Sequence, residues 1–132
     1  MSYLLDTNIV SAHLRQSSSL VHRFIQHSGR LAVPTIVLGE LYAWAYGRSD
    51  PAPVLGSIQT LLLELDLLAF DSDCAEQFGK LRVQLRQAGV TVDSVDLMIA
   101  SVALVHGLTL VTHNTKHFAG IPGLALEDWL TP

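Results

Sequence analysis

Short apolar runs alternate with stretches of helical periodicity along most of the chain. Several runs have the length and apolar character of buried strands. These runs are Tyr3–Leu5, Leu31–Val33, Leu67–Phe70, Leu108–Thr112 and Leu124–Leu126. Between them, apolar residues recur at helical spacing, as in 20–25 and 36–44. Such alternation predicts an α/β fold in which helices cover both faces of a parallel sheet, with ligands bound beyond the carboxyl ends of the strands.

Capping residues place further boundaries in the second half of the chain. Asp73 followed by Glu76 resembles a capping box, and the helix that it opens should end at Gly89. Ser94 should cap the next helix, which should end at Gly107.

The size of the chain favours a single domain over residues 1–132. Gly47–Pro53, which holds two prolines and a glycine, is the expected flexible connection within it. The longest candidate membrane segment, Leu97–Val105, is far shorter than the roughly 20 residues that a spanning helix needs. Cys74 is the only cysteine, so neither an internal disulfide nor a zinc site built on several thiolates is possible. We therefore expect a soluble cytoplasmic protein without a membrane partner.

Composition and charge narrow the function. Hydrophobic residues make up 49% of the chain and charged residues only 15%, which indicates apolar surface left for a partner or for a second copy. The formal net charge of −4 counts against a protein that binds nucleic acid by charge alone. It counts less against a nuclease, because cations bound by a carboxylate cluster restore positive potential locally.

Three of the 12 acidic residues, Asp6, Glu40 and Asp96, are embedded in apolar sequence. Most of the others fall at caps, in turns or beside polar neighbours, where solvation explains them. Partial burial of several like charges costs several kcal/mol or raises their pKa values, and a shared cation resolves both problems. The pattern therefore predicts one metal site formed by the three carboxylates.

A hard divalent ion such as Mg²⁺ takes oxygen ligands and is usually held by one or two carboxylates together with substrate phosphate. Such an ion activates water for in-line attack on a phosphodiester, so hydrolysis of RNA is the natural chemistry. The alternative is that Asp6 and Asp96 only cap helices, where the dipole contributes about 0.3 to 1 kcal/mol. That alternative leaves Glu40 unexplained, since it is expected inside a helix on its apolar side.

Four motifs, in this order and spacing, resemble those of PIN-domain nucleases, and most closely the VapC-like toxins of bacterial toxin-antitoxin pairs. The resemblance covers essentially the whole chain. The motifs are Leu5-Asp6-Thr7-Asn8, Leu38-Gly39-Glu40-Leu41, Asp96-Leu97-Met98-Ile99-Ala100, and Leu110-Val111-Thr112-His113-Asn114 with Phe118.

The resemblance implies a three-layer fold, with a five-stranded parallel sheet between helices, and RNA cleavage that depends on Mg²⁺ or Mn²⁺. It also implies inhibition by a cognate antitoxin protein and assembly as a homodimer. Asp6, Glu40 and Asp96 occupy the family's metal-binding acidic positions, and Asn114 occupies the fourth catalytic position. Aspartate is frequent there in the family, whereas Asn114 brings no negative charge.

Other polar residues near these motifs have two interpretations each. Thr7, Asn8 and Thr112 either orient carboxylates and water or, for the first two, simply cap a helix. His113 and His117 flank Asn114 and are expected to lie in a solvated loop or to contact phosphate more readily than to take part in catalysis.

Aromatic and basic side chains on two helices are weaker candidates for RNA contacts. Trp44 lies four residues after Glu40, so it shares that helix face and can stack on a base, although packing is the more common fate of Trp44, Tyr42 and Tyr46. Arg82 and Arg86 can reach phosphates, but a solvated helix face is the simpler expectation.

Two competing functions remain open at this stage. A haloacid-dehalogenase-like phosphatase also places an aspartate after its first strand, but its second aspartate would fall at Asn8, and Glu40 would have no role. A PIN-like domain that only binds RNA or protein is compatible with Asn114, whereas the intact set of three acids argues against it.

Overall fold

A computed structural model of the chain describes residues 2–15 and 18–131. A sheet of five strands runs through its centre in the order β3-β2-β1-β4-β5, and every neighbouring pair is parallel. The strands are β1 Tyr3–Leu5, β2 Leu31–Pro34, β3 Asp66–Leu68, β4 Thr109–Val111 and β5 Leu126–Glu127. The expectation of a five-stranded parallel sheet is therefore confirmed.

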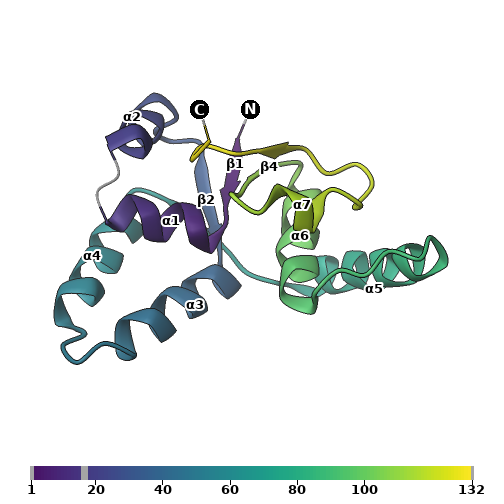
Figure 1. Cartoon of the computed structure of the whole chain (residues 1–132), viewed down its shortest axis with the longest axis horizontal. Coiled ribbons are helices and arrows are strands. Elements are labelled where there is room, and N and C mark those ends of the chain that lie inside the picture. Colours follow the sequence, from purple (N-terminus) through teal and green to yellow (C-terminus); the bar gives the residue numbers. More distant parts are fainter. Residues whose placement is uncertain (1, 16–17, 132) are drawn as a thin grey trace.

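The helices form the two outer layers of the fold, with α1 to α4 on one side of the sheet and α5 to α7 on the other (Figure 1). The α5 helix packs chiefly against α6 and extends away from the rest of the molecule (Figure 1). Their bounds are α1 Thr7–Leu14, α2 Ser18–Gln26, α3 Thr35–Tyr46, α4 Ala52–Leu62, α5 Ser72–Gln87, α6 Ser94–His106 and α7 Thr115–Phe118.

The central strands are almost entirely apolar because both faces of the sheet are covered. Every residue of β1, β2 and β4 is buried. Strands covered on both faces lose the alternation of apolar and polar residues that a half-exposed strand shows. No helix within 2–15 or 18–131 combines the length and the apolar character needed to cross a bilayer.

The strand order reverses direction between β1 and β4. The chain moves outward from β1 through β2 to β3, then returns to place β4 on the opposite side of β1. Ligands of open α/β sheets bind in the crevice at such a reversal, beyond the carboxyl ends of the strands. Asp6 directly follows β1, and its backbone N–H donates to the carbonyl of Val111 at 3.0 Å, which joins the ends of β1 and β4.

Two strands predicted from the sequence have shifted bounds in the structure. The run Leu67–Phe70 predicted a strand that the structure begins at Asp66 and ends at Leu68, because pairing with Ala32 to Pro34 of β2 sets its position. The strand expected at Leu124–Leu126 is instead Leu126–Glu127, paired with β4. Neighbouring strands, and not local apolarity, decide these boundaries.

Both helix starts assigned in the second half of the chain were wrong by one or two residues. The side chain of Asp71, not Asp73, caps α5 by accepting from the N–H of Cys74 at 3.0 Å. Asp93, not Ser94, caps α6 by accepting from the N–H of Val95. The connection expected over Gly47–Pro53 is shorter, because α4 begins at Ala52 and its first turn tolerates proline.

The expected helix end at Gly107 provides a test of the fold. Gly107 ends α6 with φ of 64°, in the left-handed region that is costly for other residues. Gly107→Ala should lower the free energy of unfolding by about 1 kcal/mol. Gly79→Ala, in the middle of α5 with open space around it, should instead raise it by up to about 1 kcal/mol. Urea denaturation measures both, and equal effects of the two variants would contradict this account.

Candidate active site

Asp6 is a buried carboxylate at the carboxyl end of β1, only 6% exposed. It caps α1, with Oδ1 accepting from the N–H of Thr7 at 2.8 Å. Its other oxygen, Oδ2, accepts from the hydroxyl of Thr112 at 2.8 Å and from the side-chain amide of Asn8 at 3.5 Å. Asp6 is therefore a helix cap and also the centre of a polar cluster that joins α1 to the end of β4.

Glu40 lies on α3 and is linked to Asp6 through Thr7, which donates hydrogen bonds to both carboxylates. The hydroxyl of Thr7 donates to Glu40 Oε1 at 2.7 Å. Glu40 was expected on the apolar side of its helix with partial burial, and this is wrong, since it is exposed. The buried stripe of α3 is Val37, Leu41 and Ala45, so Glu40 lies at the solvent edge of that stripe.

Asp96 occupies the first turn of α6, and its side chain is 21% exposed. Burial raises the pKa of this carboxyl above its ordinary value, and the nearby charges of Asp6, Asp93 and Glu40 raise it further. His117 acts in the opposite direction. Asp6 and Glu40 are therefore within electrostatic reach of Asp96, although the three acids come from different elements of the chain.

Asn114 follows β4 at the same edge of the sheet. Its backbone N–H donates to the Thr112 hydroxyl oxygen at 3.0 Å, and that hydroxyl in turn donates to Asp6. The N–H of His113 donates to the side-chain oxygen of Asn8 at 3.0 Å. These bonds hold the loop against Asp6, while the side chain of Asn114 itself is exposed.

The polar neighbours thus orient the acidic side chains. Thr7 contacts Glu40, and both Thr112 and Asn8 contact Asp6. This confirms the orienting interpretation of the three residues. Neither Thr7 nor Asn8 caps α1, because Asp6 does so.

The two histidines beside Asn114 point to different partners. Nδ1 of His117 lies 3.5 Å from Oδ2 of Asp96, so it borders the acidic cluster. Nδ1 of His113 lies 3.2 Å from Oδ2 of Asp128, which follows β5. The sequence alone offered no signal for either pairing, since the first joins α7 to α6 and the second joins two loops.

Several other candidates from the sequence have structural partners. Arg82 donates to the carbonyl of Val92 at 3.2 Å and to the hydroxyl of Ser94 at 2.9 Å, so it supports the start of α6. Arg86 is exposed on α5. The guanidinium carbons of Arg15 and Arg48 lie 5.3 Å and 5.9 Å from the ring centroid of Trp44.

The fit of a divalent cation depends on Asp6, Glu40 and Asp96. Within 2–15 and 18–131, no group of three or more His, Cys, Asp or Glu side chains is already arranged to hold an ion. The three carboxylates interact electrostatically without converging on one point. An ion that keeps several waters needs only one or two direct carboxylate ligands, so this all-oxygen donor set fits Mg²⁺ or Mn²⁺.

Comparison with known proteins agrees with this geometry. Residues 3–124 match the PIN domain family, and the chain belongs to that family. It is 32% identical over 132 residues to Ribonuclease VapC2 of Rickettsia felis, with 98% of each chain covered. It is also 32% identical over 130 residues to the tRNA(fMet)-specific endonuclease VapC of Shigella flexneri, again with 98% of each chain covered.

Solved structures of toxin-antitoxin complexes share the fold. VapBC2 from Rickettsia felis, bound to a promoter DNA fragment, has a TM-score of 0.91 at 32% identity, covering 98% of this chain and 99% of that one. DNA-bound VapBC from Salmonella typhimurium has a TM-score of 0.91 at 31% identity, covering 98% of each chain.

The bond between Thr112 and Asp6 is open to a direct test. Thr112→Val removes the buried hydroxyl that donates to the Asp6 carboxylate. The free energy of unfolding, measured in EDTA, should therefore fall by about 1.5–3 kcal/mol. In an Asp6→Asn background the same change should cost clearly less, because the charged acceptor is gone. Thr60→Val, at an exposed position of α4, is the control and should have little effect. An equal cost of Thr112→Val in both backgrounds would show that the bond is unimportant.

Proposed function

We propose that the chain is a cytoplasmic, metal-dependent endoribonuclease and the toxin of a toxin-antitoxin pair. The observation that carries this proposal is the approach of Asp6, Glu40 and Asp96 at the reversal of strand order, in a chain of the PIN-domain family. Its relatives are named ribonucleases and a transfer-RNA endonuclease, and related structures are toxin-antitoxin complexes. The transfer-RNA target of one relative is a reasonable first substrate to assay.

The proposed roles follow from exposure and hydrogen bonding. Asp6 is buried and fixed by Thr7 and Thr112, so it is the best-oriented metal ligand of the three acids. Glu40 is exposed and Asp96 partly exposed, which leaves both accessible to an incoming phosphodiester and its water. A bound Mg²⁺ or Mn²⁺ would supply an activated water and positive charge beside the leaving oxygen. Asn114, neutral and exposed at the same edge, can donate a hydrogen bond to the substrate.

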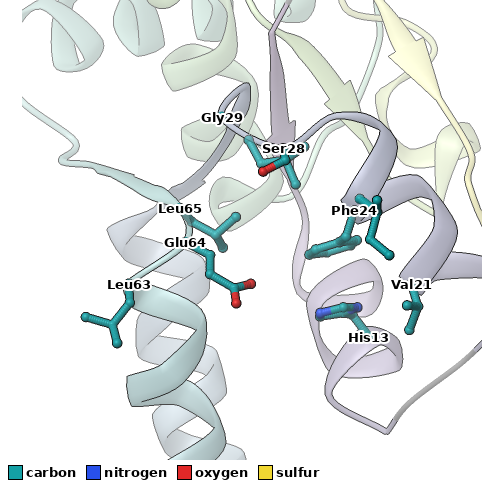
Figure 2. Close-up of a pocket in the computed structure, with 10 residues that line it drawn as sticks. His13, Val21, Phe24, Ser28, Gly29, Leu63, Glu64 and Leu65 are labelled. Atoms are coloured by element: carbon teal, nitrogen blue, oxygen red, sulfur yellow. The ribbon is translucent and has the colours of Figure 1, made fainter.

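An apolar pocket of about 670 Å³ between α2 and the end of α4 supports the antitoxin as a partner. Val21, Ile25 and Leu63 line it and are exposed. Figure 2 shows the Glu64 carboxylate pointing into this pocket toward His13, whose ring stacks on Phe24 at a centroid distance of 3.6 Å. Apolar walls with one carboxylate suit an amphipathic helix that carries a basic residue.

Self-association of the toxin is supported by a separate apolar surface. Tyr46 is 67% exposed and lies 6.4 Å from Tyr42 between ring centroids, both on α3. The two rings line a hollow with Leu55 and Gln59, and none of these residues lines the pocket on α2, so a homodimer and an antitoxin need not compete for the same residues.

The alternatives are weaker. A haloacid-dehalogenase-like phosphatase is not favoured, because the match over residues 3–124 is to the PIN domain family. A PIN-like domain that only binds is not favoured either, because the matched relatives are named as ribonucleases.

Removing one carboxylate should abolish cleavage without unfolding the protein. Asp6→Asn or Asp96→Asn loses part of the charge that holds the ion, which is worth several kcal/mol in the transition state, so the rate should fall by roughly 100-fold or more. The measurement is cleavage of labelled single-stranded RNA with Mg²⁺ or Mn²⁺, and with EDTA, alongside circular dichroism. Glu76→Gln removes an exposed acid of α5 and should keep the parental rate. Parental cleavage by either aspartate variant would reject the assignment of the site.

Metal stoichiometry tests the role of Asn114. Three ionised carboxylates carry about −3, so one divalent ion leaves only about −1 to attract a second, and a second ion would leave the site at about +1 until substrate phosphate arrives. Calorimetry of the RNA-free protein should therefore detect one ion per chain, and Asn114→Asp should tighten binding of a second. Two tight sites in the unmodified protein would contradict this role of the neutral amide.

A further inference from the structure

Two arginines gather on one tryptophan beside the acidic site, and we call Arg15, Trp44 and Arg48 the Trp44 cluster. Trp44 lies four residues after Glu40, one turn further along the same face of α3. Arg15 caps the end of α1, and Arg48 follows the end of α3. Their guanidinium carbons lie 5.3 Å and 5.9 Å from the centroid of the same ring. Residues distant in the sequence thus bring two positive charges together.

Neither Arg15 nor Arg48 has an ion-paired acid among the residues that the structure describes. The chain nevertheless has 12 acids and only eight lysines and arginines. Contact with an aromatic ring stabilises an exposed cation only slightly, by about 0.5–1 kcal/mol. Arg15 and Arg48 line one cavity with Trp44, so an anion bound there would be attracted by both charges.

A cavity of about 390 Å³ accompanies the cluster. Leu14, Pro53, Val54 and Ser57 line it together with the three residues of the cluster. Its volume lies within the range of small-ligand sites, about 300–1,000 Å³. Apolar walls together with two cations suit a phosphate group carrying a sugar or a base.

Two helices, α1 and α3, connect the cluster to the candidate active site. Thr7, at the start of α1, contacts Glu40, and Arg15, at the end of the same helix, contacts Trp44. The α1 and α3 helices therefore run side by side from the acids to the cluster, about 12 Å along α1 at 1.5 Å per residue. A single strand of RNA laid along these two helices meets both.

We propose that the Trp44 cluster binds a backbone phosphate of the RNA strand next to the bond that is cut. This rests on the proposed ribonuclease function. Arginine recognises phosphate with paired hydrogen bonds, and contact with the Trp44 ring helps to keep each planar guanidinium oriented. Bases next to the bound phosphate can stack on exposed aromatic or guanidinium planes. RNA is favoured over an acidic segment of a protein partner, because the apolar pocket on α2 presents a carboxylate and calls for a basic partner.

The test measures RNA binding apart from cleavage. Fluorescent single-stranded RNA is titrated in EDTA with Asp96→Asn protein that also carries Arg15→Ala, Arg48→Ala or both. Each arginine change should weaken binding by about five- to tenfold, and reduce the slope of log affinity against log salt by about 0.7. Arg86→Ala removes the same charge from exposed α5 and should leave affinity and slope unchanged. Thermal melts check that every variant folds.

The outcomes separate this proposal from the proposed function. Parental RNA affinity and salt slope in the Arg15→Ala, Arg48→Ala protein would overturn the phosphate site, even if Asp6→Asn still abolishes cleavage. Weakened antitoxin binding with unchanged RNA binding would overturn it too, and would assign the cluster to the protein partner. If the parental protein binds RNA through these arginines but cuts none, the nuclease proposal fails, and the cluster is an RNA phosphate site without its assigned place beside a cleaved bond.

Discussion

The reversal of strand order at β1 positions everything else in the candidate site. Because β2 and β4 flank β1 on opposite sides, helices of both outer layers begin near the carboxyl end of β1. Asp6 stands at that end and receives hydrogen bonds from Thr7 on one side and Thr112 on the other. Glu40 lies on α3, which follows β2, and Asp96 lies on α6, which precedes β4. Parallel connectivity thus concentrates negative charge at one edge of the sheet.

Concentrated negative charge has a cost that the surrounding hydrogen bonds only partly offset. The raised pKa of Asp96 reports it, since burial and the charges of Asp6 and Glu40 all disfavour the ionised form. Hydroxyl groups of Thr7 and Thr112 stabilise the other two carboxylates where they are. In the proposed function, a divalent cation would relieve the remaining repulsion and supply positive charge for the substrate phosphate. Unfavourable electrostatics in the free protein would thereby favour binding of the cation.

Three surfaces of different chemistry lie close together around α1. The acidic cluster is at its beginning, the Trp44 cluster is at its end, and the apolar pocket next to His13 borders α2. The chain has only eight lysines and arginines, and one of them, Arg82, supports the start of α6. Positive charge near the candidate site is therefore sparse outside the Trp44 cluster. In the functions proposed above, an RNA strand and a helical protein partner would meet chemically distinct surfaces on neighbouring helices.

Local sequence determined the α/β class, the buried strands β1, β2 and β4, and the unusual setting of Asp6 and Asp96. Apolar runs, including those around a carboxylate, can be recognised in the sequence before the fold is known. It did not reveal α4, whose Gly56 disfavours a helix locally and whose buried Ile58 and Leu61 depend on tertiary packing. The exposure of Glu40 and its bond to Thr7 were also decided only by the fold. Thr112 and Asp6 form a hydrogen bond although they are 106 positions apart in the sequence, and Arg15 at the end of α1 contacts Trp44 on α3. Such pairs arise from strand order and helix packing, which depend on long-range contacts that no short stretch of sequence encodes.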